Sequence, residues 1–161
     1  MFNFKTEFYL KIILIISSIA LIAAYFIEYI LGHQPCNLCL IERIPYGFNI
    51  ILIISIFILK KKEKFLVSLL IITSIFSFAI SLYHFGIEQE IIQESAACGV
   101  KNLTEGITKE EVLKQLNKRV ISCKDVTFRI FGFSLTSVNI ILSLIFIICF
   151  ANIYLKYEKK K

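Results

Sequence analysis

Residues 34–43 have the sequence QPCNLCLIER, and the chain is organised around this stretch. It places the thiols of Cys36 and Cys39 three residues apart, followed by the cation of Arg43, between two long hydrophobic runs. A Cys-x-x-Cys pair closes easily into a small disulfide ring, and in the reduced form one of its thiols is often unusually acidic. Zinc sites and structural bridges use the same spacing. The location of the motif in the chain, and the other cysteines on the same side of the membrane, therefore have to distinguish these functions.

The composition indicates a membrane protein. Of the 161 residues, 57% are hydrophobic and 19% are charged, whereas soluble domains are about 25% charged. The formal net charge of +6 does not indicate a nucleic-acid partner, because most of the basic residues flank hydrophobic runs and do not gather on one face with aromatic residues. The flanking lysines are Lys5, Lys11, Lys60, Lys61, Lys62, Lys64, Lys156, Lys159, Lys160 and Lys161.

Four hydrophobic runs predict helices that cross a bilayer, at residues 9–31, 44–59, 65–83 and 133–155. A hydrocarbon core of about 30 Å requires about 20 helical residues, and lysines that snorkel to the interface extend the shorter second run. A cleaved signal peptide is the alternative for the first run, but the apolar core of such a peptide is only about 7–15 residues long. We therefore expect an all-α membrane protein, a four-transmembrane-helix bundle that forms a single domain over residues 1–161.

Four spans place both ends of the chain on the same side of the membrane. Loops rich in lysine remain in the cytoplasm, so residues 1–8, 60–64 and 156–161 are expected there. The loops at residues 32–43 and 84–132 then lie on the outer side.

Two local features are expected from smaller patterns. Pro45 stands at the start of the second run, where a proline in the first helical turn loses no hydrogen bond. The second outer loop is too long for a plain connection. Within it, a capping box at residues 108–111 precedes apolar residues at helical spacing up to Val120, which predicts a short amphipathic helix.

The five cysteines can now be placed. Cys36 and Cys39 lie in the first outer loop and Cys98 and Cys123 in the second, which is the side of the membrane where disulfides persist. Cys149 lies inside the fourth run and is expected to be a small buried apolar side chain. The four outer cysteines are therefore the candidate redox residues.

Metal and haem sites fit these four cysteines less well. Cys98 and Cys123 do not form a second Cys-x-x-Cys, although zinc sites commonly pair two such motifs. Leu40 stands where covalent haem attachment requires a histidine. A structural bridge from Cys98 to Cys123 would stabilise the loop by about 3–4 kcal/mol, but it would not explain a Cys-x-x-Cys at the membrane face.

Arg43 has two interpretations that the spacing leaves open. It serves as an interfacial anchor, or it lies on the same helical face as Cys39, four residues earlier, if the second helix has begun by then. In the second case its cation would favour the Cys39 thiolate.

Three segments together resemble the family of the bacterial disulfide bond formation protein B, DsbB. PCNLCLIERIPY at residues 35–46 is similar to the first periplasmic loop of that family, and YHFGIE at residues 83–88 to the segment that leaves the third helix. CKD at residues 123–125, with RIFGFS at residues 129–134 and Asn139, is similar to the entry to the fourth helix. The resemblance covers essentially the whole chain. It departs at Phe128, where the family often has tryptophan, and this affects packing or membrane anchoring but not the thiols.

The resemblance implies a multi-pass protein of the bacterial inner membrane that acts as a quinone-dependent thiol oxidase. Its partners would be a periplasmic thioredoxin-fold protein of the DsbA type and the membrane quinone pool. Ubiquinone is expected before menaquinone as the cofactor, although the residues themselves do not distinguish them. No metal ion and no nucleic acid are expected.

The resemblance also implies a role for each outer cysteine. Disulfides Cys36–Cys39 and Cys98–Cys123 would be present in the oxidised enzyme. Cys98 would be attacked by the partner's thiolate, and Cys123 would then attack Cys36, forming a transient Cys36–Cys123 bridge. Cys39 would pass the electrons to the quinone.

Three further residues are implied near the quinone. Arg43 and His84 would hold or polarise its oxygens, and Glu88 follows His84 by one helical turn as an additional candidate. Two alternatives to this function remain. One is a vitamin K epoxide reductase-like protein, although its Cys-x-x-Cys typically comes late in the bundle, and the other is a non-enzymatic membrane protein with disulfide-stapled loops.

Overall fold

The computed structural model describes residues 4–59, 62–94, 98, 122–124, 129–130 and 132–158. The short helix expected at residues 108–120 lies outside these ranges. Four helices dominate the described residues: α1 (Phe4–Tyr29), α2 (Asn37–Leu59), α3 (Glu63–Glu88) and α5 (Leu135–Glu158). All four are long and apolar enough to cross a membrane, which confirms the predicted four-helix membrane bundle.

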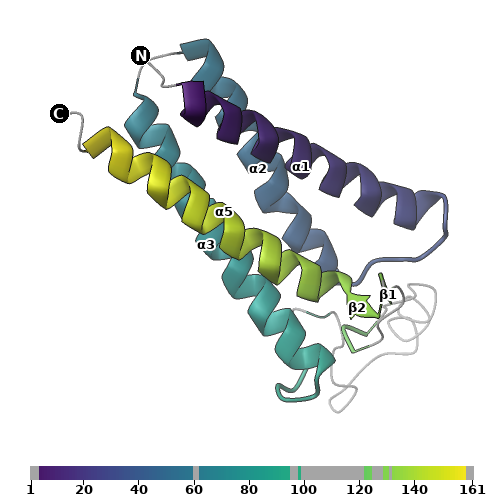
Figure 1. Ribbon diagram of the computed structural model, residues 1–161. Helices are drawn as coiled ribbons and strands as arrows, with labels where there is room; N and C mark the ends of the chain where they lie inside the picture. The colour runs from purple at the N-terminus through teal and green to yellow at the C-terminus, as the bar shows by residue number, and fades with distance from the viewer. Residues whose placement is uncertain are drawn as a thin grey trace, which may run out of the picture.

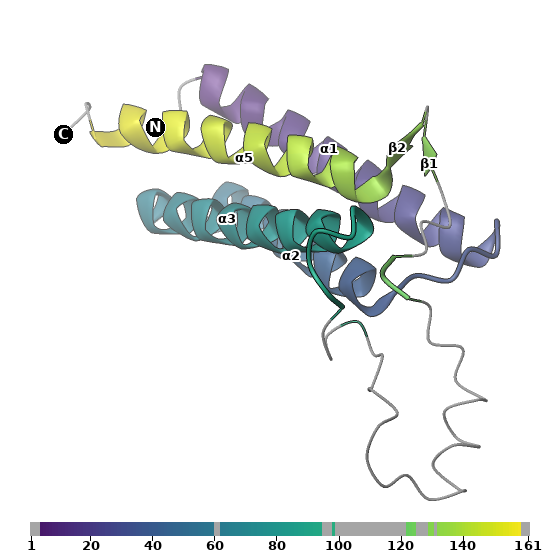
Figure 2. The ribbon, with the colours of Figure 1, turned by 90° about the horizontal axis from the view of Figure 1, so that it is seen from below.

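The helices run alternately up and down the bundle. Figure 1 shows that the first residues of α1 and α3 lie together with the last residues of α2 and α5. Viewed as in Figure 2, α1 and α5 lie on one side and α2 and α3 on the other. Along the bundle α1 packs on α2, α2 on α3 and α3 on α5, whereas α1 and α5 meet only sparsely. The seam between α1 and α5 is therefore the least tightly closed part of the bundle.

The start of α2 differs from the expectation. The helix begins at Asn37 and not at Ile44, so the connection after α1 ends at Cys36 and Pro45 lies inside the helix, not in its first turn. The backbone N–H of Leu40 donates to the carbonyl oxygen of Cys36 at 3.2 Å, which makes Cys36 the residue that caps the helix. A proline inside a membrane helix is tolerated where neighbouring helices supply partners for the freed backbone groups.

The end of α3 also lies further along the chain than expected. The helix continues past Tyr83 to Glu88, so His84 and Glu88 belong to it and not to the loop. It is closed by a tight turn in which Glu90 has a φ of 59° and the N–H of Ile91 donates to the carbonyl oxygen of Gly86 at 2.9 Å. Such a left-handed residue after the last turn is a common way to end a helix.

A short strand pair, which the all-α prediction did not include, precedes α5. Strand β1 (Arg129–Ile130) pairs antiparallel with β2 (Phe133–Ser134), with Arg129 opposite Ser134. Gly132 lies between the strands with a φ of 87°, a backbone conformation that glycine adopts without steric cost. The pair delays the start of the fourth helix from the expected residue 133 to Leu135.

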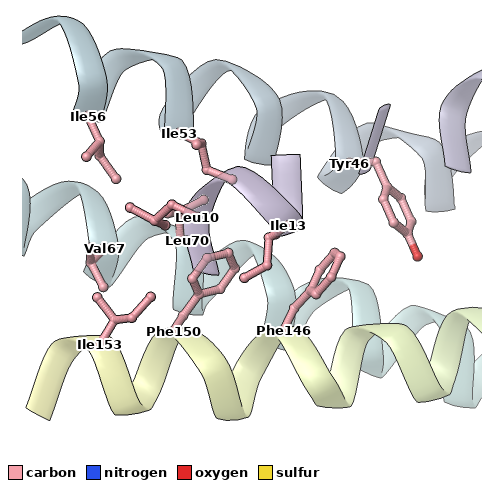
Figure 3. Packing of buried hydrophobic residues seen from close by; sticks show 10 residues of the cluster. All are labelled: Leu10, Ile13, Tyr46, Ile53, Ile56, Val67, Leu70, Phe146, Phe150 and Ile153. Atoms are coloured by element: carbon pink, nitrogen blue, oxygen red, sulfur yellow. The ribbon is translucent and has the colours of Figure 1, made fainter. Parts of the chain in front are cut away.

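The apolar core lies between the four helices, in the half of the bundle away from Cys36, Cys39, Cys98 and Cys123. Figure 3 shows its side chains pointing toward one another, with Tyr46 at one end of the cluster. Between α3 and α5 the hydroxyls of Ser77 and Ser143 meet at 3.3 Å, as expected for serines in membrane helices. The buried cluster consists of Leu10, Ile13, Tyr46, Ile53, Ile56, Val67, Leu70, Phe146, Phe150 and Ile153.

Candidate redox site

Four of the five cysteines gather at the end of the bundle where α2 begins and α3 ends. Cys36, Cys98 and Cys123 are buried in one cluster, together with Leu38 and Ile87, and Cys39 packs against it. The sulfur atoms of Cys36 and Cys39 lie 2.7 Å apart. The described residues include all five cysteines, and none of them is bridged to another, so the predicted disulfide pairings remain predictions. Cys149 lies half-buried in α5, away from this cluster.

Cys36 occupies the position at which a helix stabilises negative charge. Its sulfur accepts a hydrogen bond from the backbone N–H of Cys39 at 3.2 Å, and the N-terminal end of a helix carries partial positive charge. Hydrogen bonds with Cys123, Cys39 and His84 lower the pKa of the Cys36 thiol far below its usual value. The hydrogen bond to Cys36 and burial raise the pKa of Cys123. The negative charge of the reduced site therefore resides on Cys36, with Cys123 as a protonated donor.

His84 connects Cys36 to a buried carboxylate. Its Nε2 atom lies 3.5 Å from the sulfur of Cys36, and its Nδ1 atom lies 2.9 Å from Oε1 of Glu42. The histidine side chain is almost completely buried, as is the carboxylate. The ligand atoms of Cys36, Cys39 and His84 all lie within 4.8 Å of one another, so these three residues form a set able to hold a metal ion.

Asn139 ties the same carboxylate to the fourth helix. Its side-chain amide donates to Oε2 of Glu42 at 2.9 Å and to the hydroxyl of Ser81 at 2.7 Å, and its oxygen accepts a hydrogen bond from Tyr46. Sequence reasoning did not assign Glu42 or Ser81 to the site. Glu42 was expected in the loop before the second span. Only the earlier start of α2 places it inside a membrane helix, where an acidic residue usually faces the bundle interior and has a function.

Glu88 lies on the other side of His84. Its Oε1 atom accepts a hydrogen bond from the hydroxyl of Thr136 at 2.6 Å and is 3.9 Å from Nε2 of His84. The hydroxyl of Thr136 also lies 3.2 Å from Nδ1 of His84. Glu88 faces a second hollow of about 560 Å³, formed with the strand pair and the start of α5.

A cavity of about 240 Å³ opens beside Cys39, between α1, α2 and α5. Its polar end is formed by Cys39, Glu42 and Arg43. Arg43 makes an ion pair with Glu28 of α1, and its guanidinium lies 5.1 Å from the ring centre of Tyr25. The remaining lining residues are Ala20, Leu21, Ala23, Ala24, Ile27, His33, Gln34, Pro35, Tyr46, Leu135, Thr136, Val138, Asn139 and Leu142.

The lining of this cavity suits an apolar ligand that carries a few polar groups. Ligand pockets combine apolar walls with a few polar groups that fix orientation, and here the walls come from small and aliphatic side chains of α1 and α5. Arg43 and Cys39 lie on the same cavity, because α2 has begun before both of them. His84 and Glu88 do not line it, so the structure separates them from Arg43.

The fold and the site together define a multi-helix membrane protein with two pairs of thiols that meet beside a cavity between its helices. Residues 6–153 match the family model of disulfide bond formation protein DsbB. The chain belongs to the DsbB family, and it is thus a membrane oxidoreductase of disulfide bond formation. It is 32% identical over 150 residues to the uncharacterized protein RP370 of Rickettsia prowazekii (strain Madrid E), covering 92% of this chain and 87% of the relative. No solved structure matches the chain.

Replacing Asn139 tests the buried network. Asn139→Ala removes the donor to Glu42 and the acceptor for Tyr46, which leaves two buried polar groups without that partner. The expected loss in the free energy of unfolding is about 1–3 kcal/mol. Chemical unfolding in detergent micelles, followed by circular dichroism, measures it. Asn152→Ala, on an exposed position of the same helix, is the matched control and should change stability little. Equal losses in the two variants would contradict the network.

Proposed function

We propose that this protein re-oxidises a dithiol protein of thioredoxin fold outside the cytoplasm and passes the electrons through its two cysteine pairs to a membrane quinone. The observation that carries the proposal is the position of Cys39, which packs against the cluster of the other three outer cysteines and also lines the cavity between α1, α2 and α5. A single residue thus joins a thiol cluster to a space that faces the apolar part of the bundle. Family membership favours this function over a vitamin K epoxide reductase-like enzyme and over a stapled non-enzymatic protein.

The order of the thiols supports a relay by disulfide exchange. Cys123 makes side-chain hydrogen bonds with both Cys98 and Cys36, and Cys36 with Cys39, so the four sulfurs form a chain of neighbours. Each exchange step requires only the attack of a thiolate on a neighbouring disulfide sulfur. The resting disulfides in this proposal are Cys36–Cys39 and Cys98–Cys123.

Two electrons pass from the partner to the Cys36–Cys39 pair in four thiol–disulfide exchanges. The partner's thiolate attacks Cys98, forming a mixed disulfide and releasing Cys123. Cys123 then attacks Cys36, which forms the Cys36–Cys123 bridge and releases Cys39. The partner's second thiol displaces Cys98, and the partner leaves as a disulfide. Cys98 then attacks Cys123, which breaks the Cys36–Cys123 bridge, restores the Cys98–Cys123 bridge and releases Cys36. One disulfide has then been made on the partner and one has been lost from the Cys36–Cys39 pair.

His84 acts in this proposal on the thiol side of the site. Its Nδ1 atom is hydrogen-bonded to Glu42, which directs Nε2 at the sulfur of Cys36, 3.5 Å away. Glu42, held in turn by Asn139, fixes the orientation of the ring. His84 is thus a positioning residue for Cys36, and its implied role at the quinone oxygens has no support from the lining of the cavity.

Cys39, Arg43 and the walls of the cavity would hold the quinone. When bound, a quinone supplies the oxidising power, since it takes up two electrons and two protons. Arg43 is placed to orient a carbonyl oxygen by hydrogen bonding, while its ion pair with Glu28 holds the guanidinium in place. The apolar side chains of α1 and α5 exclude water from the sulfur of Cys39 and admit a ligand from the bilayer through their sparse seam. Ubiquinone is proposed before menaquinone.

The proposed orientation puts the thiols on the periplasmic side of a bacterial inner membrane. Lys62, Lys64 and Lys156 lie at the opposite end of the bundle from Cys36, where α2 ends, α3 begins and α5 ends. Lysine-rich ends remain in the cytoplasm, so both termini are assigned to that side.

The Cys39→Ser variant tests the exit of electrons. The purified protein is mixed with a reduced thioredoxin-fold dithiol protein and a quinone, and quinol formation is followed by absorbance. We expect turnover to fall to the uncatalysed rate, because among the described residues Cys39 is the one outer thiol that lines the cavity. Cys149→Ser, which removes a cysteine outside the cluster, should retain full turnover. Undiminished quinol formation by Cys39→Ser would overturn the proposed route.

Filling the cavity tests its assignment to the quinone. Ala24→Phe projects a ring into the cavity from α1, so the KM for quinone should rise at least about tenfold, or about 1.4 kcal/mol of binding free energy. Exchange of disulfides with the reduced partner in the absence of quinone should persist. Ala79→Phe, on an exposed face of α3, is the matched control. An unchanged KM in Ala24→Phe would place the quinone elsewhere.

A further inference from the structure

We propose that the reduced form of the site binds a divalent cation of the Zn²⁺ class through Cys36, Cys39 and His84. This inference goes beyond the proposed oxidase function and rests on the grouping of two thiols and one imidazole whose ligand atoms lie within 4.8 Å of one another. Sulfur and imidazole nitrogen are the ligands that zinc prefers in proteins. The sequence alone argued against zinc because Cys98 and Cys123 do not form a second Cys-x-x-Cys. It did not consider His84, which comes from α3, 45 residues after Cys39 (84 − 39).

The distances suit tetrahedral coordination after a small adjustment. Zinc–sulfur and zinc–nitrogen bonds of about 2.3 and 2.0 Å place two tetrahedral ligand atoms about 3.5–3.8 Å apart. The sulfur of Cys36 and Nε2 of His84 already lie 3.5 Å apart. The two sulfurs, now 2.7 Å apart, have to separate by about 1 Å. Cys39 is only half-buried and borders the cavity, so its side chain has room to make this movement.

The surroundings of His84 match those of a metal-binding histidine. Such a histidine usually gives its second ring N–H to a carboxylate, which fixes the ring and leaves the other nitrogen free for the metal. Here Nδ1 lies 2.9 Å from Oε1 of Glu42, and Nε2 faces the two thiols. Asn139 fixes the other carboxylate oxygen. The ring is thus pre-oriented before any ion binds.

Charge and enclosure also favour a divalent cation. Two thiolates and a neutral imidazole balance the charge of Zn²⁺, and a neutral complex is the one that a buried site accommodates at the lowest desolvation cost. Cys36 and His84 are almost fully buried.

Binding of this kind depends on the redox state of the pair. When Cys36 and Cys39 are joined as a disulfide, neither sulfur is a thiolate and the metal loses two of its three ligands. The ion is therefore bound only by the dithiol form, and it holds Cys36 and Cys39 away from further exchange. Zn²⁺ is accordingly expected to be an inhibitor that traps the reduced enzyme.

Cobalt substitution tests the site directly. The full-length protein in detergent is reduced, freed of reductant under anaerobic conditions and titrated with Co²⁺. We expect one ion per chain, with the intense thiolate-to-cobalt charge-transfer and visible d–d bands of a tetrahedral site, and displacement by Zn²⁺. His84→Ala should abolish these bands, and Glu42→Gln should weaken Co²⁺ affinity about 10–100-fold through the loss of its charge behind His84.

Three controls separate this site from other binding. His33→Ala, which removes the second of the two histidines, and Cys149→Ser should leave the cobalt spectrum unchanged. The oxidised protein should show no such bands. Circular dichroism establishes that each variant is folded, and Glu42→Gln, which keeps both ligand types, replaces His84→Ala if the latter unfolds. The proposal would be overturned if Glu42→Gln had both the cobalt spectrum and the Co²⁺ affinity of the wild type. It would also be overturned if the oxidised protein bound Co²⁺ as well as the reduced protein.

Discussion

The contact between Nδ1 of His84 and Oε1 of Glu42, at 2.9 Å, is the interaction on which the active end of the bundle depends. It joins α2 to α3 in an apolar setting, where a polar group without a partner costs several kcal/mol. Asn139 brings α5 into the same network through Oε2 of Glu42. Three helices are thus held in one register by buried polar groups that need one another as hydrogen-bond partners. This register places His84 against Cys36.

The same register divides the site into two sides that share Cys39. On one side the buried sulfurs of Cys36, Cys98 and Cys123 are neighbours. On the other side lies the cavity between α1, α2 and α5, with Arg43 at its polar end. In the proposed function, disulfide exchange belongs to the first side and contact with the quinone to the second. The division explains why a histidine and an arginine close to the same motif would serve different partners.

The sequence predicted the four helices because run length and hydropathy are local properties, and the structure confirms the bundle. It placed the helix ends less well. Glu42, Arg43 and His84 were placed in loops because polar side chains interrupt the hydrophobic runs there. In the structure each of them has a polar partner on another helix, and no local sequence pattern predicts such a pair. The order of spans and loops identified the outer cysteines as candidates, and the family resemblance implied their roles. Neither predicted that His84 faces a thiol and not the cavity. The helix ends and the position of His84 therefore depend on contacts between helices, which the sequence alone does not reveal.

In the proposed function, the Cys36–Cys39 dithiol gives its electrons directly to a quinone, and this transfer can be isolated from the exchange steps. It is tested most directly by a single turnover of the Cys98→Ala/Cys123→Ala double variant, which retains only that pair in the cluster. The variant is reduced, freed of reductant and mixed anaerobically with quinone, and quinol and remaining thiols are both counted. Direct transfer predicts one quinol formed and two thiols lost per chain. Retention of both thiols, with no quinol formed, would contradict it.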